Sequence, residues 1–250
     1  MSGPFETTVL WLTWRQLFAK RRIYLAAAFS LVPLLFAVFY TFSAEDNAMR
    51  RVLFYAMLNR EIIIGTIVPL AAAVFGTTAF GGEVDDGTLV YLLIKPIPRW
   101  RIVLSKYVVA VLSTLAVMVP SMLLPWLLMR GPEATQAMLV GYLAGGVLAA
   151  TIYCALFLSL GMMSRRSLVL ALLYVIAYEA VLSRNLVGAK SLSVREFAVA
   201  AAQAASHGAI KLPGFVVPMT TVWTMSAIFF VGALILSLRK LSRYELAEKV

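Results

Sequence analysis

The chain has 250 residues, of which 62% are hydrophobic and only 14% are charged, whereas soluble domains are about 25% charged. This composition excludes an ordinary soluble domain and predicts a single membrane domain over residues 1–250, with no room for a fused ATPase. The net charge of +10 does not indicate nucleic-acid binding, because the Lys and Arg residues stand beside apolar runs, where topology and lipid head groups account for them.

Residues 1–22 mix apolar and basic side chains, which predicts a helix in the membrane interface, with Trp11 and Trp14 at head-group depth and Arg15 among its basic residues. The apolar run that follows is longer than the core of a usual signal peptide, so we expect it to be retained as a first span. The apolar runs together predict an all-α polytopic protein with six transmembrane helices at about residues 23–42, 62–80, 102–129, 137–163, 168–182 and 215–238.

Three further structural features are predicted, two in the segments between spans and one within a span. Residues 43–61 carry charges of both signs and are interpreted as the loop between the first two spans. Pro120 and Pro125 predict a kink or tilt in the third span. The mixed region after the fifth span is expected to contain a surface helix over Val194–Ala205.

The distribution of Lys and Arg predicts the orientation. Counting them on the two sides of a six-span arrangement gives 14 against 8. The positive-inside rule then places both termini, residues 80–99 and the Arg165-Arg166 turn in the cytoplasm.

Residues 80–99 are a polar segment between two long apolar runs. Glu83, Asp85 and Asp86 stand within four positions of one another, and a single acid at the bilayer centre costs roughly 2.5 to 3.5 kcal/mol. The segment is therefore expected to lie outside the lipid.

This segment also has the signals of a short amphipathic helix. Gly87 breaks the preceding helix, Thr88 can act as N-cap, Leu89 begins an apolar face and Pro96 ends the helix. Two turns are not stable alone in water, so the helix would be held by its own membrane domain or by a partner protein. An ordinary solvated loop that obeys the positive-inside rule is the alternative.

Motifs for chemistry are scarce. The Gly-Ala-Lys-Ser sequence at residues 188–191 lacks the spacing of a phosphate-binding loop, the single His207 is expected at the surface, and the single Cys154 lies in an apolar run. We therefore predict no catalytic residue and no metal site on this chain.

Two features of the spans have more than one interpretation. Glu179 is an acid inside an apolar run, and such acids relay protons, bind cations or pair across helices; it is also close enough to the polar Ser183-Arg184 to reach water or to pair with Arg184. Gly141-x-x-x-Gly145-Gly146 could allow close helix packing or a dimer contact.

A resemblance to a known family favours one of the interpretations of residues 80–99. The sequence Glu83-Val-Asp-Asp-Gly-Thr-Leu-Val-Tyr-Leu-Leu-Ile-Lys-Pro-Ile-Pro-Arg99, continued by Ile102-Val-Leu-Ser-Lys106, resembles the E-x-x-x-G-T-L…P-[IV]-x-R…K signature of ABC-2 type permeases, the membrane subunits of ABC exporters. Residues 174–179 and 192–196 resemble the fifth span and outer loop of the branch that includes the nitrous-oxide-reductase maturation permease, although Tyr178 stands where relatives often have Trp. The basic N-terminus, the six spans and the length also fit.

The resemblance implies a permease that works as a homodimer or heterodimer in the plasma (inner) membrane and couples ATP hydrolysis by a separate cytoplasmic ATPase to export. That ATPase would bind ATP and Mg²⁺, whereas this chain would bind no cofactor. The N-terminal helix and a coupling loop would dock onto the ATPase. By the match to the signature, the loop residues are Glu83, Asp86, Gly87, Thr88, Leu89, Pro96 and Arg99.

Two other classes of function are alternatives to an ABC permease. An ion-coupled transporter or channel without ATP would use Glu179 as its coupling group. An intramembrane enzyme would need a nucleophile with a histidine partner or a metal cluster within the spans, and the sequence offers neither.

Overall fold

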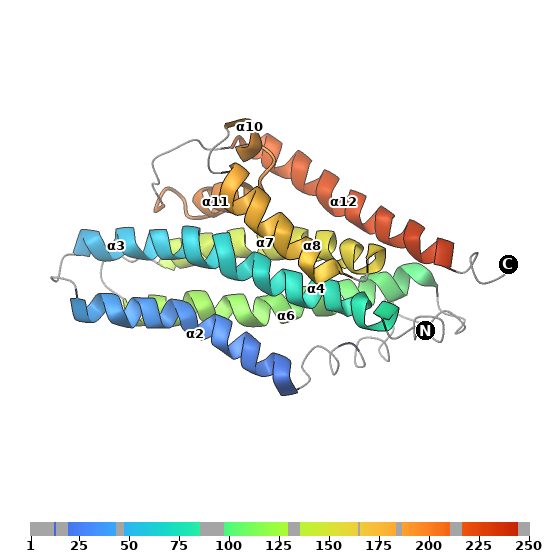
Figure 1. Cartoon of the computed structure of the whole chain (residues 1–250). Coiled ribbons are helices and arrows are strands. Elements are labelled where there is room, and N and C mark those ends of the chain that lie inside the picture. Colours follow the sequence, from blue (N-terminus) through green and yellow to red (C-terminus); the bar gives the residue numbers. More distant parts are fainter. Residues whose placement is uncertain are drawn as a thin grey trace, which may run out of the picture.

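The computed structural model describes residue 13 and residues 20–43, 48–85, 98–129, 136–164, 166–183, 187–210 and 217–244. In these residues the chain forms helices and no strands, as predicted (Figure 1). The α-helices are α2 (Lys20–Ser43), α3 (Ala48–Met57), α4 (Val68–Asp85), α6 (Arg99–Leu128), α7 (Gln136–Met163), α8 (Ser167–Leu173), α10 (Val187–Lys190), α11 (Val194–Ala205) and α12 (Met219–Tyr244). Two segments are π-helices, η1 (Leu58–Ile67) and η2 (Tyr174–Leu182).

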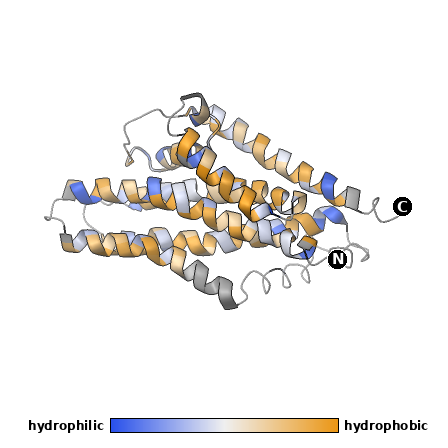
Figure 2. Cartoon of the chain, in the orientation of Figure 1, coloured by the Kyte–Doolittle hydropathy of each residue, from blue (hydrophilic) through white to orange (hydrophobic). Residues whose placement is uncertain are grey.

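Each of the six predicted spans coincides with a helix. Four stretches are long and apolar enough to cross a bilayer, namely Met49–Val84, Arg99–Leu128, Gln136–Met163 and Met219–Leu241. The apolar parts of α2 and of α8 with η2 are shorter, Ala28–Phe42 and Ser167–Glu179. Hydrophobic residues dominate along the helices (Figure 2). The chain is therefore a multi-pass membrane protein, and the count of six spans remains a prediction.

The prediction of a loop over residues 43–61 is wrong for most of that range. α3, η1 and α4 form one continuous helix that begins at Ala48. The charges that suggested a loop are accommodated on the helix surface, because Arg50 is exposed while Tyr55 and Ala56 of the same helix are buried. In the third span, α6 continues through both Pro120 and Pro125.

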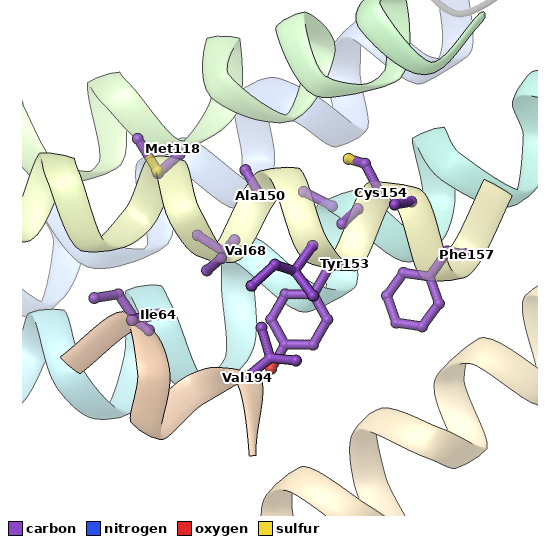
Figure 3. Close-up of a cluster of buried hydrophobic side chains, with 14 of the residues drawn as sticks. Ile64, Val68, Met118, Ala150, Tyr153, Cys154, Phe157 and Val194 are labelled. Atoms are coloured by element: carbon purple, nitrogen blue, oxygen red, sulfur yellow. The ribbon is translucent and has the colours of Figure 1, made fainter. Parts of the chain in front are cut away.

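The core is built around α7, which packs against α4, α6, α11 and α12. Its largest side chains, Tyr142, Tyr153 and Phe157, are fully buried. Figure 3 shows Tyr153 near Val68 and Val194, side chains that come from other elements, and Phe157 further along α7. By contrast only 22% of the apolar stretch in α12 is buried, against 61 to 67% in the other three long spans, so α12 is the most peripheral of the four.

The helix predicted over Val194–Ala205 exists with those bounds, but its expected surface position is wrong. α11 is largely buried against α7. The two helices approach closely at Gly141 and Gly145 of α7, where a side chain would collide with the backbone carbonyls of Ala202 and Ala198. The Gly-x-x-x-Gly pattern thus serves close helix packing within this chain.

Candidate functional site

α4 ends and α6 begins at the same end of the bundle (Figure 1). A buried lysine of α6 joins these two helices. Lys106 of α6 donates to Glu83 Oε1 at 2.6 Å and to the Ala79 carbonyl oxygen at 2.5 Å. Its ammonium nitrogen also lies 4.6 Å from the centroid of the Phe80 ring. We call Ala79, Phe80, Glu83 and Lys106 the α4–α6 link.

This link is a strong constraint because Lys106 is fully buried. A buried charge is tolerated only when charged and polar partners surround it, and removing one partner leaves the other charge uncompensated. The link therefore holds together the two helices on either side of residues 86–97.

In the sequence Lys106 entered only as a basic residue and as the last position of the family signature, so its pairing with Glu83 was missed. The signal that could have revealed it is a lysine inside the apolar run of the third span, a position where a charged side chain usually has a specific partner.

The structure describes only part of the predicted coupling loop. Glu83 lies in the last turn of α4, and Arg99 is the first residue of α6, following the N-cap residue Pro98. The other predicted loop residues, Asp86, Gly87, Thr88, Leu89 and Pro96, lie outside the described residues, as does the helix expected over residues 88–95. The same holds for Trp11, Trp14 and Arg15.

A second polar cluster surrounds the start of α11, and Glu179 is at its centre. The Glu179 carboxylate accepts hydrogen bonds from Ser193 Oγ at 2.6 Å and from the Val194 backbone N–H at 3.1 Å. Ser193 is the N-cap of α11 and accepts from the Glu196 N–H. Because the N-terminus of a helix attracts negative charge, the carboxylate stabilises the start of α11.

The burial of Glu179 corrects one interpretation of this residue. Its side chain does not reach water in the chain as described, because the residue is only 1% exposed. Arg184, the other expected partner, lies outside the described residues. In the structure the Glu179 carboxylate ties η2 to the start of α11.

Ion pairs tie the same end of α11 to η1. Arg195 pairs with Glu61, and Arg60 lies 3.7 Å from carboxylate oxygens of both Glu61 and Glu196. The pairs of Arg195 with Glu61 and of Arg60 with Glu196 connect residues that are far apart in sequence. Together with Glu179 and Ser193 they form what we call the α11 cluster, whose members are Arg60, Glu61, Glu179, Ser193, Arg195 and Glu196.

The α11 cluster includes residues from both π-helices. At the end of η1 the Val68 N–H donates to the Ile63 carbonyl oxygen, which is the five-residue spacing of a π-helix. The Thr66 hydroxyl donates to the Glu61 carbonyl oxygen. Gly65 leaves room for the Arg195 side chain, whose Nε would lie 3.2 Å from an added Cβ. π-Helical segments are frequent at functional sites.

The sequence identified Glu179 and the extent of α11 but not the pairing of Glu61 with Arg195. Local signals existed, since Ser193-Val-Arg-Glu196 has the spacing of a capping box. The long-range pairing, however, depends on how η1 packs against α11.

Neither cluster has the composition of a catalytic or metal centre. Among the described residues, no group of three His, Cys, Asp or Glu side chains could hold a metal ion. Cys154 is a buried free thiol within hydrogen-bond distance of Thr114 Oγ1, and His207 is exposed in the turn after α11, as expected. The arrangement is suited to holding and moving helices.

Taken together, the apolar helices packed around the central α7 define a helical multi-pass membrane protein. A family model described as ABC-2 family transporter protein matches residues 17–182, more than half of the chain. The chain belongs to this family, which confirms the resemblance seen in the sequence. A search of curated proteins finds no match. The family match ends at Leu182, so it leaves out α11 and α12, and assignment to the nitrous-oxide-reductase branch remains a prediction.

Proposed function

We propose that this chain is the membrane-spanning permease of an ABC exporter, driven by a separate ATPase subunit. Membership in the ABC-2 family supports the class of protein. The α4–α6 link is the structural observation that carries the proposed coupling, because it joins the helices on both sides of the segment expected to meet the ATPase.

The link gives the coupling a physical form. If the ATPase displaces residues 86–97, α4 and α6 cannot separate without exposing or unpairing the buried Lys106 charge. The two helices would therefore move as one rigid body. Since α4 also packs on α7, this motion would reach the core of the chain.

The proposed orientation is six spans with both termini in the cytoplasm of a cell whose plasma membrane holds the protein. α4 ends, α6 begins and α12 ends at the same end of the bundle (Figure 1). Basic residues gather at that end of these helices, among them Arg99, Arg101, Arg239 and Lys240. This distribution supports a cytoplasmic placement.

The proposed assembly contains two permease chains and two ATPase subunits, with a pathway between the permeases that is exposed alternately to the two sides. ATP and Mg²⁺ would bind the ATPase subunits. The segments that would dock on them are the N-terminal residues with Trp11, Trp14 and Arg15 and the loop from Asp86 to Pro96.

The proposal is tested by reconstituting the chain with an ABC ATP-binding subunit from the same organism and measuring co-purification and ATP hydrolysis. We expect Gly87→Pro to lose the association or the stimulated hydrolysis. The matched control is Gly82→Ala, because an added Cβ at Gly82 meets no atom within 4 Å.

Two results would overturn the proposal. One is that Gly87→Pro and Glu83→Lys both leave association and hydrolysis intact. The other is that the chain alone in vesicles moves protons or ions along a gradient and loses this activity with Glu179→Gln, which would favour an ion-coupled transporter.

A further inference from the structure

An exposed tryptophan and a neighbouring arginine stand at the start of α6. Trp100 is 46% exposed and Arg101 is partly exposed. The Arg101 Cζ lies 5.3 Å from the centroid of the Trp100 ring, a cation–π distance. Because Arg99–Leu128 is apolar enough to cross a bilayer, both side chains lie at the end of a membrane span, which is the depth of the lipid head groups.

The Arg101 guanidinium has no anionic partner. No ion pair or side-chain hydrogen bond joins it to any of the described residues; its Nε is enclosed, whereas Nη1 and Nη2 are accessible. By contrast Arg60, Lys106 and Arg195 each pair with a glutamate, and no acidic residue stands in the first turn of α6. An arginine with accessible nitrogens and no carboxylate beside it is suited to binding an external anion.

The face of α6 that carries Arg101 continues as an apolar strip. Leu104, Val108 and Leu112 follow Arg101 after three, seven and eleven positions, the spacing that keeps residues on one side of a helix. We call these three residues the α6 strip. Leu104 and Val108 are partly exposed and Leu112 is 48% exposed. A ligand that fits this face of α6 has an anion at one end and hydrocarbon behind it.

We propose that Arg101 and Trp100 bind the phosphate of an anionic phospholipid, whose acyl chain lies along the α6 strip. The guanidinium donates from Nη1 and Nη2 to the phosphate oxygens, and the Trp100 ring lies beside the glycerol and ester groups. A head group with a net negative charge is preferred to a zwitterionic one, because the first turn of α6 has no carboxylate to pair with a head-group ammonium. The site does not involve the α4–α6 link or the α11 cluster, so the proposal is independent of ATP coupling.

A phospholipid accounts for both halves of this site, whereas other anions account for one. An acidic side chain of an ATPase subunit would pair with Arg101 but would leave the α6 strip without an occupant. Free phosphate would likewise contact only the guanidinium. A phospholipid presents its phosphate and its hydrocarbon in the order in which Arg101 and the α6 strip follow one another into the membrane, and basic residues at the cytoplasmic surface attract anionic lipids.

The test titrates the full chain in detergent with phosphatidylglycerol or with phosphatidylcholine and counts the bound lipids by native mass spectrometry. We expect the first phosphatidylglycerol to bind more tightly than the first phosphatidylcholine. Arg101→Gln should weaken the first phosphatidylglycerol about 5-fold, the contribution of one arginine near an anionic lipid. The variant should elute as a single species in size-exclusion chromatography, because the Arg101 side chain has no hydrogen bond or ion pair to lose among the described residues.

Arg166→Gln is the matched control. It removes the same charge from an exposed residue of the turn before α8. The dissociation constant of phosphatidylglycerol should change less than about 2-fold, because exposed charges that do not contact the ligand are largely screened by salt.

A second variant and a labelling experiment test the rest of the site. Trp100→Leu should weaken phosphatidylglycerol about 2- to 5-fold, the value of one exposed cation–π contact expressed as affinity. Trp223→Leu, which changes an exposed tryptophan near the start of α12, should not. In vesicles, phosphatidylglycerol with a photoreactive diazirine near the start of one acyl chain should label Leu104 and Val108 after illumination, as located by mass spectrometry.

Three results would overturn the proposal. The first is binding of phosphatidylglycerol that Arg101→Gln weakens no more than Arg166→Gln does. The second is displacement of phosphatidylglycerol by an equal concentration of inorganic phosphate, since the site would then recognise the free anion. The third is that Arg101→Gln leaves lipid binding unchanged but abolishes association with an ABC ATP-binding subunit in detergent, which would assign Arg101 to the contact with that subunit.

Discussion

The two polar clusters differ in how they bring charges together. The α4–α6 link joins residues 23 positions apart and depends on one fully buried cation. The α11 cluster joins residues as far apart as Glu61 and Arg195, separated by 134 positions, and shares its charges among several side chains. In that cluster the Glu61 side chain is 42% exposed, so water compensates part of its charge.

This difference predicts different responses to the loss of a single residue. A link with one buried cation is weakened strongly when either charge is removed, because Lys106 has Glu83 as its one charged partner in the link. A network with a partly hydrated member can lose one contact and keep the others. The link is thus suited to passing motion between α4 and α6, and the cluster to holding α11 in place.

The largest effect is expected for Lys106→Met. The change leaves the Glu83 carboxylate, whose side chain is 17% exposed, without its cation partner, which should lower the free energy of unfolding by about 3 kcal/mol. Unfolding of the purified chain in detergent, followed by circular dichroism, measures this loss.

The matched control for that prediction is the double variant Glu83→Gln with Lys106→Met. It removes both charges and keeps similar volumes, so much of the stability should return. If the single and double variants were equally unstable, the ion pair would not be what holds the two helices together.

A smaller effect is expected for Gly145→Leu. The new side chain would collide with the Ala198 carbonyl oxygen of α11, and overpacking of this kind costs about 1 to 3 kcal/mol. Gly232→Leu on α12 is the control, since nothing lies within 4 Å of a Cβ there. Thermal unfolding measures the stability of both variants. Equal stability would show that the close packing of α11 against α7 at Gly145 is not required for the stability of the fold.

The positions of the helices could be predicted from the sequence, because a bilayer requires long apolar segments whose backbone N–H and C=O groups are all hydrogen-bonded within the helix. The sequence placed all six predicted spans on helices and gave the bounds of α11. It failed for residues 43–61, where charged residues are compatible with a helix whose other face is buried. The sequence also gave a wrong prediction for the exposure of α11. An alanine-rich helix has the same sequence pattern whether it lies on the surface or packs against the glycines of a neighbouring helix.

For the polar clusters the sequence identified single residues but not their partners. Glu179 stood out as an acid in an apolar run, and Glu83 stood out through a motif. Lys106 and Arg195 could not be assigned, because their partners are set by which helix faces meet, and periodicity alone does not give that pairing. The π-helical geometry of η1 and η2 likewise left no signal that distinguishes it from an α-helix.

The smallest effects are expected at the N-terminus of α11. Ser193→Ala removes the N-cap and should cost about 1 kcal/mol. Glu179→Gln keeps an oxygen acceptor but removes the charge beside the helix N-terminus, which should cost a similar amount. Both losses can be measured by thermal unfolding in detergent.

These two changes also decide whether the start of α11 is held by a network or by independent contacts. Because Ser193 Oγ donates to Glu179 while it accepts from the Glu196 N–H, each variant already disturbs the contact that the other removes. The double variant should therefore lose less stability than the sum of the single losses, by about 0.5 kcal/mol or more. Strict additivity would mean that the carboxylate and the cap act separately, and the α11 cluster would then be no more cooperative than the single pair at the α4–α6 link.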